Sequence, residues 1–273
     1  MQRVPDSHKG ENGKVAIIGG SRHQHGAPLF SLLAAEASGV DLLFACVPAC
    51  HAETAKAHCL NAQVHSFAGD ELCGEDVDAI LELLATVDCA VIGPGLGRDA
   101  AQLSCIEKII ASASCPLVLD ASALQPFTLA AVRKKTVVLT PHRGELERMG
   151  IAQEDLAATA KKFGVTLLCK GQIDRIASPD GQVEEVEGGN AGLTVGGTGD
   201  ALAGLAAGLI AQGMRWSEAC RLASLTIKKA GDHLQARQGF SYRTQDVIET
   251  IPMILHGGGR LQQDLPGRGT LIA

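Results

Sequence analysis

The stretch 189–204 reads GNAGLTVGGTGDALAG and combines six glycines with a single carboxylate, Asp200. From Asp200 the chain continues as DALAGLAAGLIAQG, which is apolar all round and therefore predicts a helix buried in a core. The GGTG before it can present the unpaired N–H groups of a first helical turn without obstruction by side chains. Since a helix start is also partly positive, we expect an anion site, most naturally for phosphate, at Gly196, Gly197, Thr198 and Gly199.

Asp200 stands where a negative ligand would bind, and two interpretations of it are open. The carboxylate could simply cap the helix, which would stabilise it by about 1 kcal/mol. Alternatively, it could accept the proton of a hydroxyl that attacks a phosphoryl group, while the adjacent N–H groups stabilise the developing charge. The second interpretation explains why an acid stands in an anion site, and it makes Asp200 the candidate catalytic base.

The rest of the chain predicts an α/β fold. Apolar runs alternate with helix-length segments, as in a parallel sheet that is covered on both faces. The predicted strands lie in 14–20, 41–47, 89–93, 116–121, 136–141 and 165–171. The predicted helices are 28–38, 100–111, one from 141, 200–211, 217–236 and 242–254. Residues 171–187 alternate apolar and polar residues around Pro179-Asp180-Gly181, which predicts an antiparallel hairpin.

The domain organisation follows from the continuity of these segments. No Pro- or Ser-rich linker or charge block interrupts them, so residues 1–273 are expected to form a single domain with a core of about 14–254. The glycine-rich residues 255–273 are expected to be a loose tail, whose TLIA end could dock as a strand.

Composition excludes several classes of protein. The net charge is −6 and Lys and Arg do not cluster, so no nucleic-acid partner is expected. The longest apolar run, 201–211, is shorter than the roughly 18 residues of a membrane span, and the polar start MQRVPDSHKGENGK is no secretory signal. Nine scattered cysteines without a CxxC pair are typical of reduced thiols. We therefore expect a soluble, cytoplasmic protein without a membrane partner.

Two common phosphate-binding motifs are missing. The chain contains no G-x-x-x-x-G-K-[ST] sequence, which excludes a P-loop, and GPGLG at 93–97 lacks the G-x-G-x-x-G spacing. Phosphate must therefore be held in another way.

Six motifs together carry a family resemblance. GGTGD resembles the anion hole and catalytic base of the ribokinase-like superfamily, and TPHRGE at 140–145 is similar to its T-P-N-x-x-E segment. The full ordered set resembles the ATP- or ADP-dependent NAD(P)H-hydrate dehydratases over about residues 14–236. The set is GGSRHQHGAPLF, VIGPGLGRD, VLDASAL, LTPHRGELE, CKG and GLTVGGTGDALAG.

The resemblance implies a fold and an activity. The fold would be a ribokinase-like three-layer α/β/α sandwich with a mostly parallel central sheet and an antiparallel edge hairpin. The activity would be repair of the S-epimer of hydrated NADH or NADPH (NADHX, NADPHX). ADP or ATP, with Mg²⁺, would phosphorylate the ring hydroxyl, and phosphate would then leave. The resemblance also implies a homo-oligomer, a homotetramer as in relatives.

The resemblance also assigns residues. The hydrate would contact Ala27, Gly95, Gly97, His142 and Asp200, and Glu145 could order Mg²⁺ through water. The adenine nucleotide would contact Lys170, Gly171, Gln172, Ile173, Asp174, Asn190, Ala191, Gly192, Leu193, Thr194 and Val195.

Simpler interpretations of single residues remain open. Lys170 could end a strand with its ammonium in water, His142 could be an exposed first-turn residue, and Glu145 could merely complement a helix dipole. Asp120 could face a substrate from the carboxyl edge of a strand. Ala191 stands where the family often has proline, and this difference affects the geometry expected of the nucleotide-binding site.

Two other functions are compatible with the same motifs. One is a kinase of the same superfamily that acts on a hydroxymethylpyrimidine or thiazole alcohol and leaves a stable phosphoester. The other is a catalytically inactive nucleotide sensor, which would have no use for an acid in its anion site.

Overall fold

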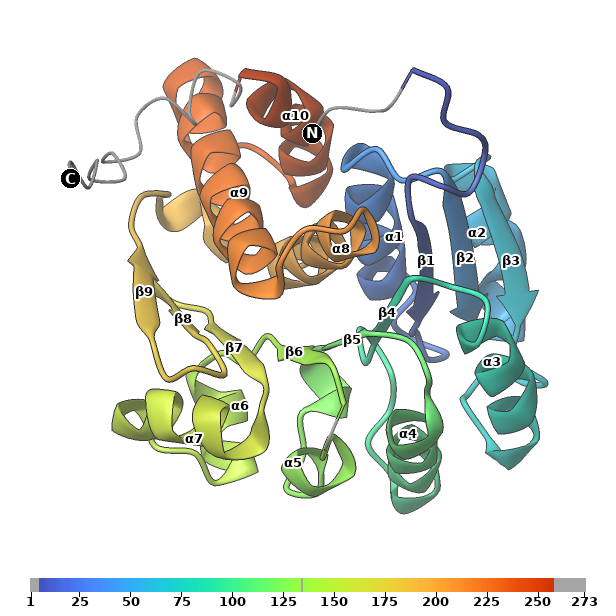
Figure 1. Cartoon of the computed structure of the whole chain (residues 1–273). Coiled ribbons are helices and arrows are strands. Elements are labelled where there is room, and N and C mark those ends of the chain that lie inside the picture. The colour runs from blue at the N-terminus through green and yellow to red at the C-terminus, as the bar shows by residue number, and fades with distance from the viewer. Residues whose placement is uncertain (1–4, 134, 258–273) are drawn as a thin grey trace.

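A computed structural model describes residues 5–133 and 135–257, and within these ranges nine strands form one sheet (Figure 1). The strands are β1 (Lys14–Ile18), β2 (Leu42–Val47), β3 (Ala62–Ser66), β4 (Cys89–Ile92), β5 (Leu117–Leu119), β6 (Val137–Leu139), β7 (Thr166–Cys169), β8 (Asp174–Ala177) and β9 (Val183–Val186). Their order across the sheet is β3-β2-β1-β4-β5-β6-β7-β8-β9.

Helices and short 3₁₀ turns connect the strands. The helices are α1 (Gly26–Ala37), α2 (Ala52–His58), α3 (Val77–Leu84), α4 (Ala100–Ser112), α5 (Thr128–Ala131), α6 (Arg143–Met149), α7 (Leu156–Phe163), α8 (Thr198–Ala211), α9 (Trp216–Gln238) and α10 (Thr244–Gly257). The 3₁₀ turns are η1 (Ala49–His51), η2 (Gly74–Asp76), η3 (Ala121–Ala123), η4 (Gln153–Asp155) and η5 (Ala191–Thr194).

The sheet is mostly parallel, as predicted. The seven neighbouring strands β3, β2, β1, β4, β5, β6 and β7 pair in parallel. The pairs β7–β8 and β8–β9 are antiparallel. The predicted edge hairpin is β8–β9, and its turn is closed by Ser178 N–H donating to Gln182 O at 2.9 Å. Gly181 adopts φ +88° in this turn, a conformation that favours glycine.

Two apolar cores lie on the two faces of the sheet. Along β1, Val15 and Ile17 join the core under α1, α8, α9 and α10, while Ala16 and Ile18 join the core under α3 and α4. This alternation is the period of a strand that is buried on both faces. Figure 1 shows the resulting layers, with α8, α9 and α10 over one face and α3 to α7 over the other.

Several predicted boundaries were wrong. The helices predicted from residues 28, 141, 200 and 242 begin at Gly26, Arg143, Thr198 and Thr244. The α8 start moves to Thr198 because Gly197, at φ +99°, is its N-cap and Gly197 O accepts from Ala201 N–H at 2.9 Å. The prediction also lacked α2, α3, α5, α7 and β3. β3 has the sequence AQVHS and no fully buried residue, so it carries little of the apolar signal by which strands are found.

The predicted buried helix is α8, and its glycines explain how it packs. A Cβ at Gly204 would collide with the backbone of Ser31 in α1, and one at Gly208 with the side chain of Ser38. Glycine therefore lets α1 and α8 approach closely beside the sheet, which positions the start of α8.

Two further predictions concern the chain as a whole. Among the described helices, none combines the length and apolarity that crossing a bilayer requires. The predicted tail overlaps the end of α10, and its TLIA end lies outside the described residues.

Candidate active site

The candidate site lies where the carboxyl ends of β5, β6 and β7 meet the start of α8. Asp120 follows β5, Thr140 to His142 follow β6, and Lys170 follows β7. In an open parallel sheet, this is the edge at which ligands bind. Pairing between His142 and Lys170 continues the β6–β7 ladder into the site.

The GGTG segment, the predicted anion hole, lies directly at the start of α8. A Cβ at Gly197 would collide with the ring of Phe30, whereas one at Gly196 would meet nothing. The Thr198 hydroxyl donates to Leu193 O at 2.7 Å and lies 3.0 Å from Val195 O. Thr198 therefore offers a ligand its backbone and not its side chain. Because the α8 ladder begins with Ala201 N–H, the preceding N–H groups are available to an anion.

Asp200 lies inside the first turn of α8 and is not its cap. The N-cap is Gly197 and no side chain caps the helix, so the capping interpretation of Asp200 was wrong. Among the described residues, none donates a hydrogen bond to the Asp200 carboxylate; only its carbonyl oxygen is bonded, to Ser31 Oγ at 2.8 Å. Burial, and then the charge of Asp120, raise the pKa of Asp200 to about 7, against the opposing effect of Lys170. Asp200 can therefore exchange a proton near neutral pH.

Lys170 is held beside Asp200 by two buried acids. Its Nζ lies 2.6 Å from Asp120 Oδ1 and 3.7 Å from Glu145 Oε2, and its side chain is only 18% exposed. Burial alone would lower the pKa of Lys170, but Asp120 and Glu145 outweigh it, and the net shift is upward. The suggestion that Lys170 ends a strand with its ammonium in water was therefore wrong. A Cβ at Gly199 would lie 3.3 Å from Nζ, which places this cation beside the GGTG segment.

Glu145 and His142 form a capping box at the start of α6. Glu145 Oε2 accepts from His142 N–H at 2.9 Å, and His142 Nδ1 accepts from Glu145 N–H at 3.3 Å. Glu145 therefore caps α6, and it also contacts Lys170. The His142 side chain is 55% exposed and remains accessible to a substrate.

Of the residues assigned to the hydrate, Ala27 on α1 and Gly95 in the loop after β4 lie close together, whereas His142 follows β6 and Asp200 lies in α8. Gly95 is buried at φ +71°, and a Cβ there would lie 3.2 Å from Ala27 Cβ. Gly97 N–H donates to Gln102 Oε1 at 2.9 Å, which fixes the end of the GPGLG loop. Ala27 lies on α1, and Ser31 of the same helix donates to Asp200 O at 2.8 Å, so α1 links Ala27 to the start of α8.

The residues assigned to the nucleotide lie in two segments, and the side chains of Asp174 and Asn190 hold these segments in place. Asp174 Oδ1 accepts from Gly171 N–H at 2.8 Å, and Asp174 Oδ2 from Ser224 Oγ at 2.6 Å. Asn190 Oδ1 accepts from Gly192 N–H at 3.0 Å and from the Tyr242 hydroxyl at 2.6 Å. Backbone and apolar groups, such as the 44% exposed Ile173, are left for a ligand.

Lys228 is a structural residue of the site that the sequence analysis missed. From α9 it donates to Gln172 O at 2.8 Å and to Gly188 O at 3.3 Å, and so it joins the two nucleotide loops. It is 6% exposed. Its neighbours at i−4 and i+4 on α9 are Ser224 and Asp232, so no apolar pattern in the sequence distinguished this lysine.

Thr140 was also missed. Its hydroxyl donates to Asp120 Oδ1 at 2.8 Å.

The described residues fit Mg²⁺ only if substrate phosphates supply some of its ligands. No group of three or more His, Cys, Asp or Glu side chains within them could hold a metal ion. Mg²⁺ commonly binds through one or two carboxylates together with water and substrate phosphates. Glu145 and Asp120 lie at the correct edge for such an arrangement, although both contact Lys170.

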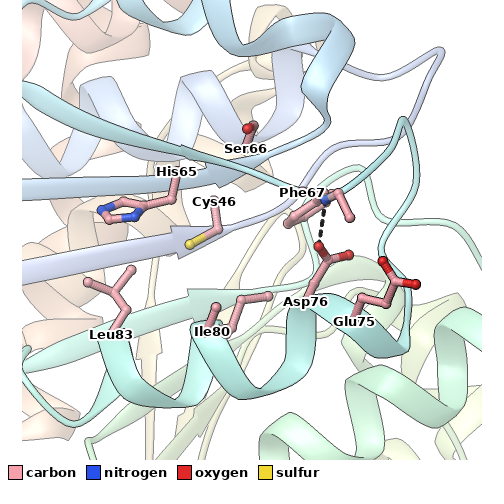
Figure 2. Close-up of a pocket in the computed structure, with 10 residues that line it drawn as sticks. Cys46, His65, Ser66, Phe67, Glu75, Asp76, Ile80 and Leu83 are labelled. Carbon is pink, nitrogen blue, oxygen red and sulfur yellow. Dashed lines mark hydrogen bonds between the residues drawn. The ribbon is translucent and has the colours of Figure 1, made fainter.

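A cavity of about 260 Å³ lies away from this site, between β3 and α3 (Figure 2). Cys46, His65, Ile80 and Leu83 line it. Asp76 also lines it, but its carboxylate already accepts the N–H groups of Ala68 and Cys73 at 2.7 and 2.8 Å. None of the predicted site residues contributes to this cavity, so we place the chemistry at α8.

Comparison with known proteins identifies the family of the chain. Residues 15–253 match the family model described as NAD(P)H-hydrate dehydratase. The bifunctional NAD(P)H-hydrate repair enzyme Nnr of Methanopyrus kandleri is 34% identical over 263 residues, covering 93% of this chain and 51% of the relative. The chain thus spans about half the length of that relative. The ADP-dependent (S)-NAD(P)H-hydrate dehydratase of Nitrosopumilus maritimus is 34% identical over 268 residues, covering 93% and 92%.

A solved structure supports the fold. A ribokinase-like superfamily protein of Enterococcus faecalis superimposes with a TM-score of 0.83 at 28% identity and covers 94% of this chain and 91% of its own. The predicted ribokinase-like α/β/α architecture is therefore confirmed. Because the family model covers most of the sequence, and relatives of equal length share a third of its residues, the chain belongs to the NAD(P)H-hydrate dehydratase family.

Proposed function

We propose that the protein dehydrates the S-epimer of hydrated NADH and NADPH at the expense of ADP or ATP. One observation carries the proposal: Asp200, whose pKa is raised to about 7, lies in the first turn of α8 beside unpaired N–H groups and the fixed cation Lys170. This arrangement can take a proton from an alcohol while a phosphoryl group is stabilised next to it.

The chemistry proceeds in two steps. First, the ring hydroxyl oxygen attacks the terminal phosphorus of the donor, its proton passes to Asp200, and AMP leaves from ADP, or ADP from ATP. Second, the carbon–oxygen bond to the new phosphate breaks with electrons supplied by the ring nitrogen. Loss of a proton from the neighbouring carbon then restores the double bond. Phosphate is a far better leaving group than hydroxide, so positioning and one proton transfer are the main tasks of the protein.

The residue roles follow from this scheme and stay proposals. The backbone of Gly196, Gly197, Thr198 and Gly199 would hold the transferred phosphoryl group. The loops 170–174 and 190–195 would hold the adenine nucleotide, and Ala27, Gly95, Gly97 and His142 would hold the hydrate beside Asp200. Mg²⁺ would screen the donor phosphates, with Glu145 ordering its water ligands.

The test is product analysis. Purified protein is incubated with chemically hydrated NADH and Mg²⁺, with ADP and ATP in separate tubes, and reduced-nicotinamide absorbance and free phosphate are measured. Equal amounts of regenerated NADH and released phosphate support the proposal and identify the donor. A stable phosphoester without NADH would instead show an alcohol kinase, and nucleotide binding without turnover would show a sensor.

We also propose that the protein is a homo-oligomer, a homotetramer as the family resemblance implies, and that it acts in the cytoplasm without nucleic-acid or membrane partners. The net charge of −6 supports the absence of a nucleic-acid partner. Light scattering of the purified protein tests the tetramer, since a monomer of 28.3 kDa would contradict it.

A further inference from the structure

Two arginines converge on the turn η3, at the rim of the candidate site. Arg98 directly follows the GPGLG loop, and its Nε donates to Ser122 Oγ at 3.2 Å. Arg148, on α6, donates from Nη1 to Leu124 O at 3.3 Å and to Ala121 O at 3.5 Å. One short turn therefore holds both guanidinium groups.

The turn itself is rigidly built. Ala121 adopts φ +49°, which is uncommon for a residue with a Cβ and is found mainly where the surroundings enforce it. Ser122 Oγ donates to Leu96 O at 2.6 Å, so the turn is tied to the GPGLG loop. The arginines are thus carried by the same structure that positions Gly95 and Gly97.

The charges of Arg98 and Arg148 are not neutralised by a carboxylate. Neither side chain forms an ion pair with any of the residues that the structure describes. Six other arginines do, namely Arg22, Arg143, Arg175, Arg215, Arg221 and Arg243. Burial, and then the nearby charge of Arg148, lower the pKa of Arg98, with Glu145 opposing them. Two like charges held together in this way favour binding of an anion.

The chemistry of the pair suits phosphate. A guanidinium presents planar, paired donors that match the oxygens of a phosphate, and it stays charged at any working pH. The anion hole at α8 serves the phosphoryl donor. A hydrated dinucleotide brings its own pyrophosphate, and NADPHX brings a 2′-phosphate as well, and these groups also need partners.

We propose that Arg98 and Arg148 form a phosphate subsite for the hydrated dinucleotide, distinct from the anion hole. This inference rests on the proposed function, because it assumes that a dinucleotide binds along the GPGLG loop. The subsite determines substrate affinity and not the chemical step, since it contacts a part of the substrate that does not react.

The test compares Arg98→Met and Arg148→Met with wild type on hydrated NADH and hydrated NADPH, with kcat and KM determined separately. Loss of one charge-assisted contact is expected to raise the KM for hydrate about ten- to a hundredfold, with kcat and the KM for ADP or ATP nearly unchanged. Arg143→Met is the matched control, because Arg143 lies on the same helix, is 80% exposed and pairs with Glu147. Arg98→Lys keeps the positive charge but not the paired guanidinium donors. It should therefore lose less affinity for the hydrate than Arg98→Met.

Comparison of the two hydrates shows which phosphate of the substrate the subsite binds. An equal rise in KM for both hydrates assigns the subsite to the pyrophosphate, and a rise confined to hydrated NADPH assigns it to the 2′-phosphate. An unchanged KM for hydrate, or a rise confined to the donor, overturns the inference.

A binding measurement keeps this test independent of turnover. NADH and NADPH are titrated against wild type and variants by fluorescence, and thermal melting verifies that each variant is folded. Weaker binding to the Met variants supports the subsite even if wild type regenerates no NADH. If wild type turns over while both Met variants bind and react as it does, only the subsite fails.

Discussion

Asp200 combines a position at the positive start of a helix with a pKa that is raised instead of lowered. A helix start and Lys170 both favour the charged carboxylate. Burial and the neighbouring acids Asp120 and Glu145 nevertheless dominate and raise the pKa to about 7. The site therefore keeps an acid that loses its proton only near neutral pH, which is the property of a general base.

Asp200→Asn should abolish turnover without loss of nucleotide affinity. The amide keeps the shape of the side chain but cannot accept the hydroxyl proton, so we expect kcat to fall by about a thousandfold or more. Steady-state kinetics with hydrated NADH, together with calorimetric titration of ADP, check this. Asp78→Asn, at an exposed position on α3, is the control, and an active Asp200→Asn enzyme would refute the assignment of the base.

The pH dependence of activity should report the pKa of Asp200. Because the unprotonated form is the base, kcat/KM should fall about tenfold per pH unit on the acid side of this pKa, at about 7, and level off above it. A pH profile of kcat/KM from pH 5 to about 9 measures this. A profile that stays flat down to pH 5 would contradict the assignment.

The same pKa shift predicts an effect on stability. Between the ordinary pKa of 3.8 and the folded value of about 7, the folded protein binds a proton that the unfolded chain releases, so stability falls as pH rises through this window. Asp200→Asn lacks this penalty. It should be more stable than wild type by about 2 kcal/mol at pH 8, allowing for the exposed part of the side chain, and by less at pH 5. Urea denaturation at both pH values checks the sign.

At the scale of elements, the contact of α1 with α8 decides where the first turn of α8 lies. α8 is apolar on all sides, and its Gly204 packs against the backbone of Ser31, whose hydroxyl also bonds Asp200 O at 2.8 Å. The contact therefore couples helix packing to the position of Asp200.

Gly204→Ala should destabilise the protein, because the added methyl group meets backbone and not a movable side chain. We expect a loss of about 2 kcal/mol or more in the free energy of unfolding, measured by urea denaturation. Gly74→Ala, where a Cβ would meet nothing within 4 Å, is the matched control and should change stability by less than about 1 kcal/mol. Equal effects of the two substitutions would show that the α1–α8 contact tolerates a side chain.

At the scale of the whole molecule, the site is assembled from segments that are far apart in the chain. Lys228 of α9 joins Gln172 to Gly188, and Tyr242, just before α10, bonds Asn190 at 2.6 Å. The two C-terminal helices thus hold both nucleotide loops against the sheet.

Lys228→Met should weaken ADP binding by about tenfold, because two loops lose their common donor. The measurement is the rise in Tm with added ADP, which should shrink relative to wild type. Lys229→Met, at the next position on α9, is the control and should leave the ADP-dependent rise unchanged. A full ADP response in Lys228→Met would show that the loops do not depend on this lysine.

The sequence by itself determined the local features of this protein. Neighbouring residues determine the strand and helix periods, the hairpin turn at Gly181 and the buried glycine-rich helix. This is because backbone freedom and apolar patterning act over short distances along the chain. The place of Asp200 and the GGTG segment at the start of this helix could be predicted for the same reason. The edge strand β3 could not, since it buries too little apolar surface to show a pattern.

Only the tertiary structure decided which of these residues act on one another. Lys170 could have pointed into water; it lies instead between Asp120 and Glu145, which come 50 and 25 residues earlier in the chain. The raised pKa of Asp200, the link through Lys228 and the position of Arg98 and Arg148 at one turn likewise arise from packing across the sheet edge. Charge interactions and desolvation depend on distance in space, and a linear sequence does not contain that distance.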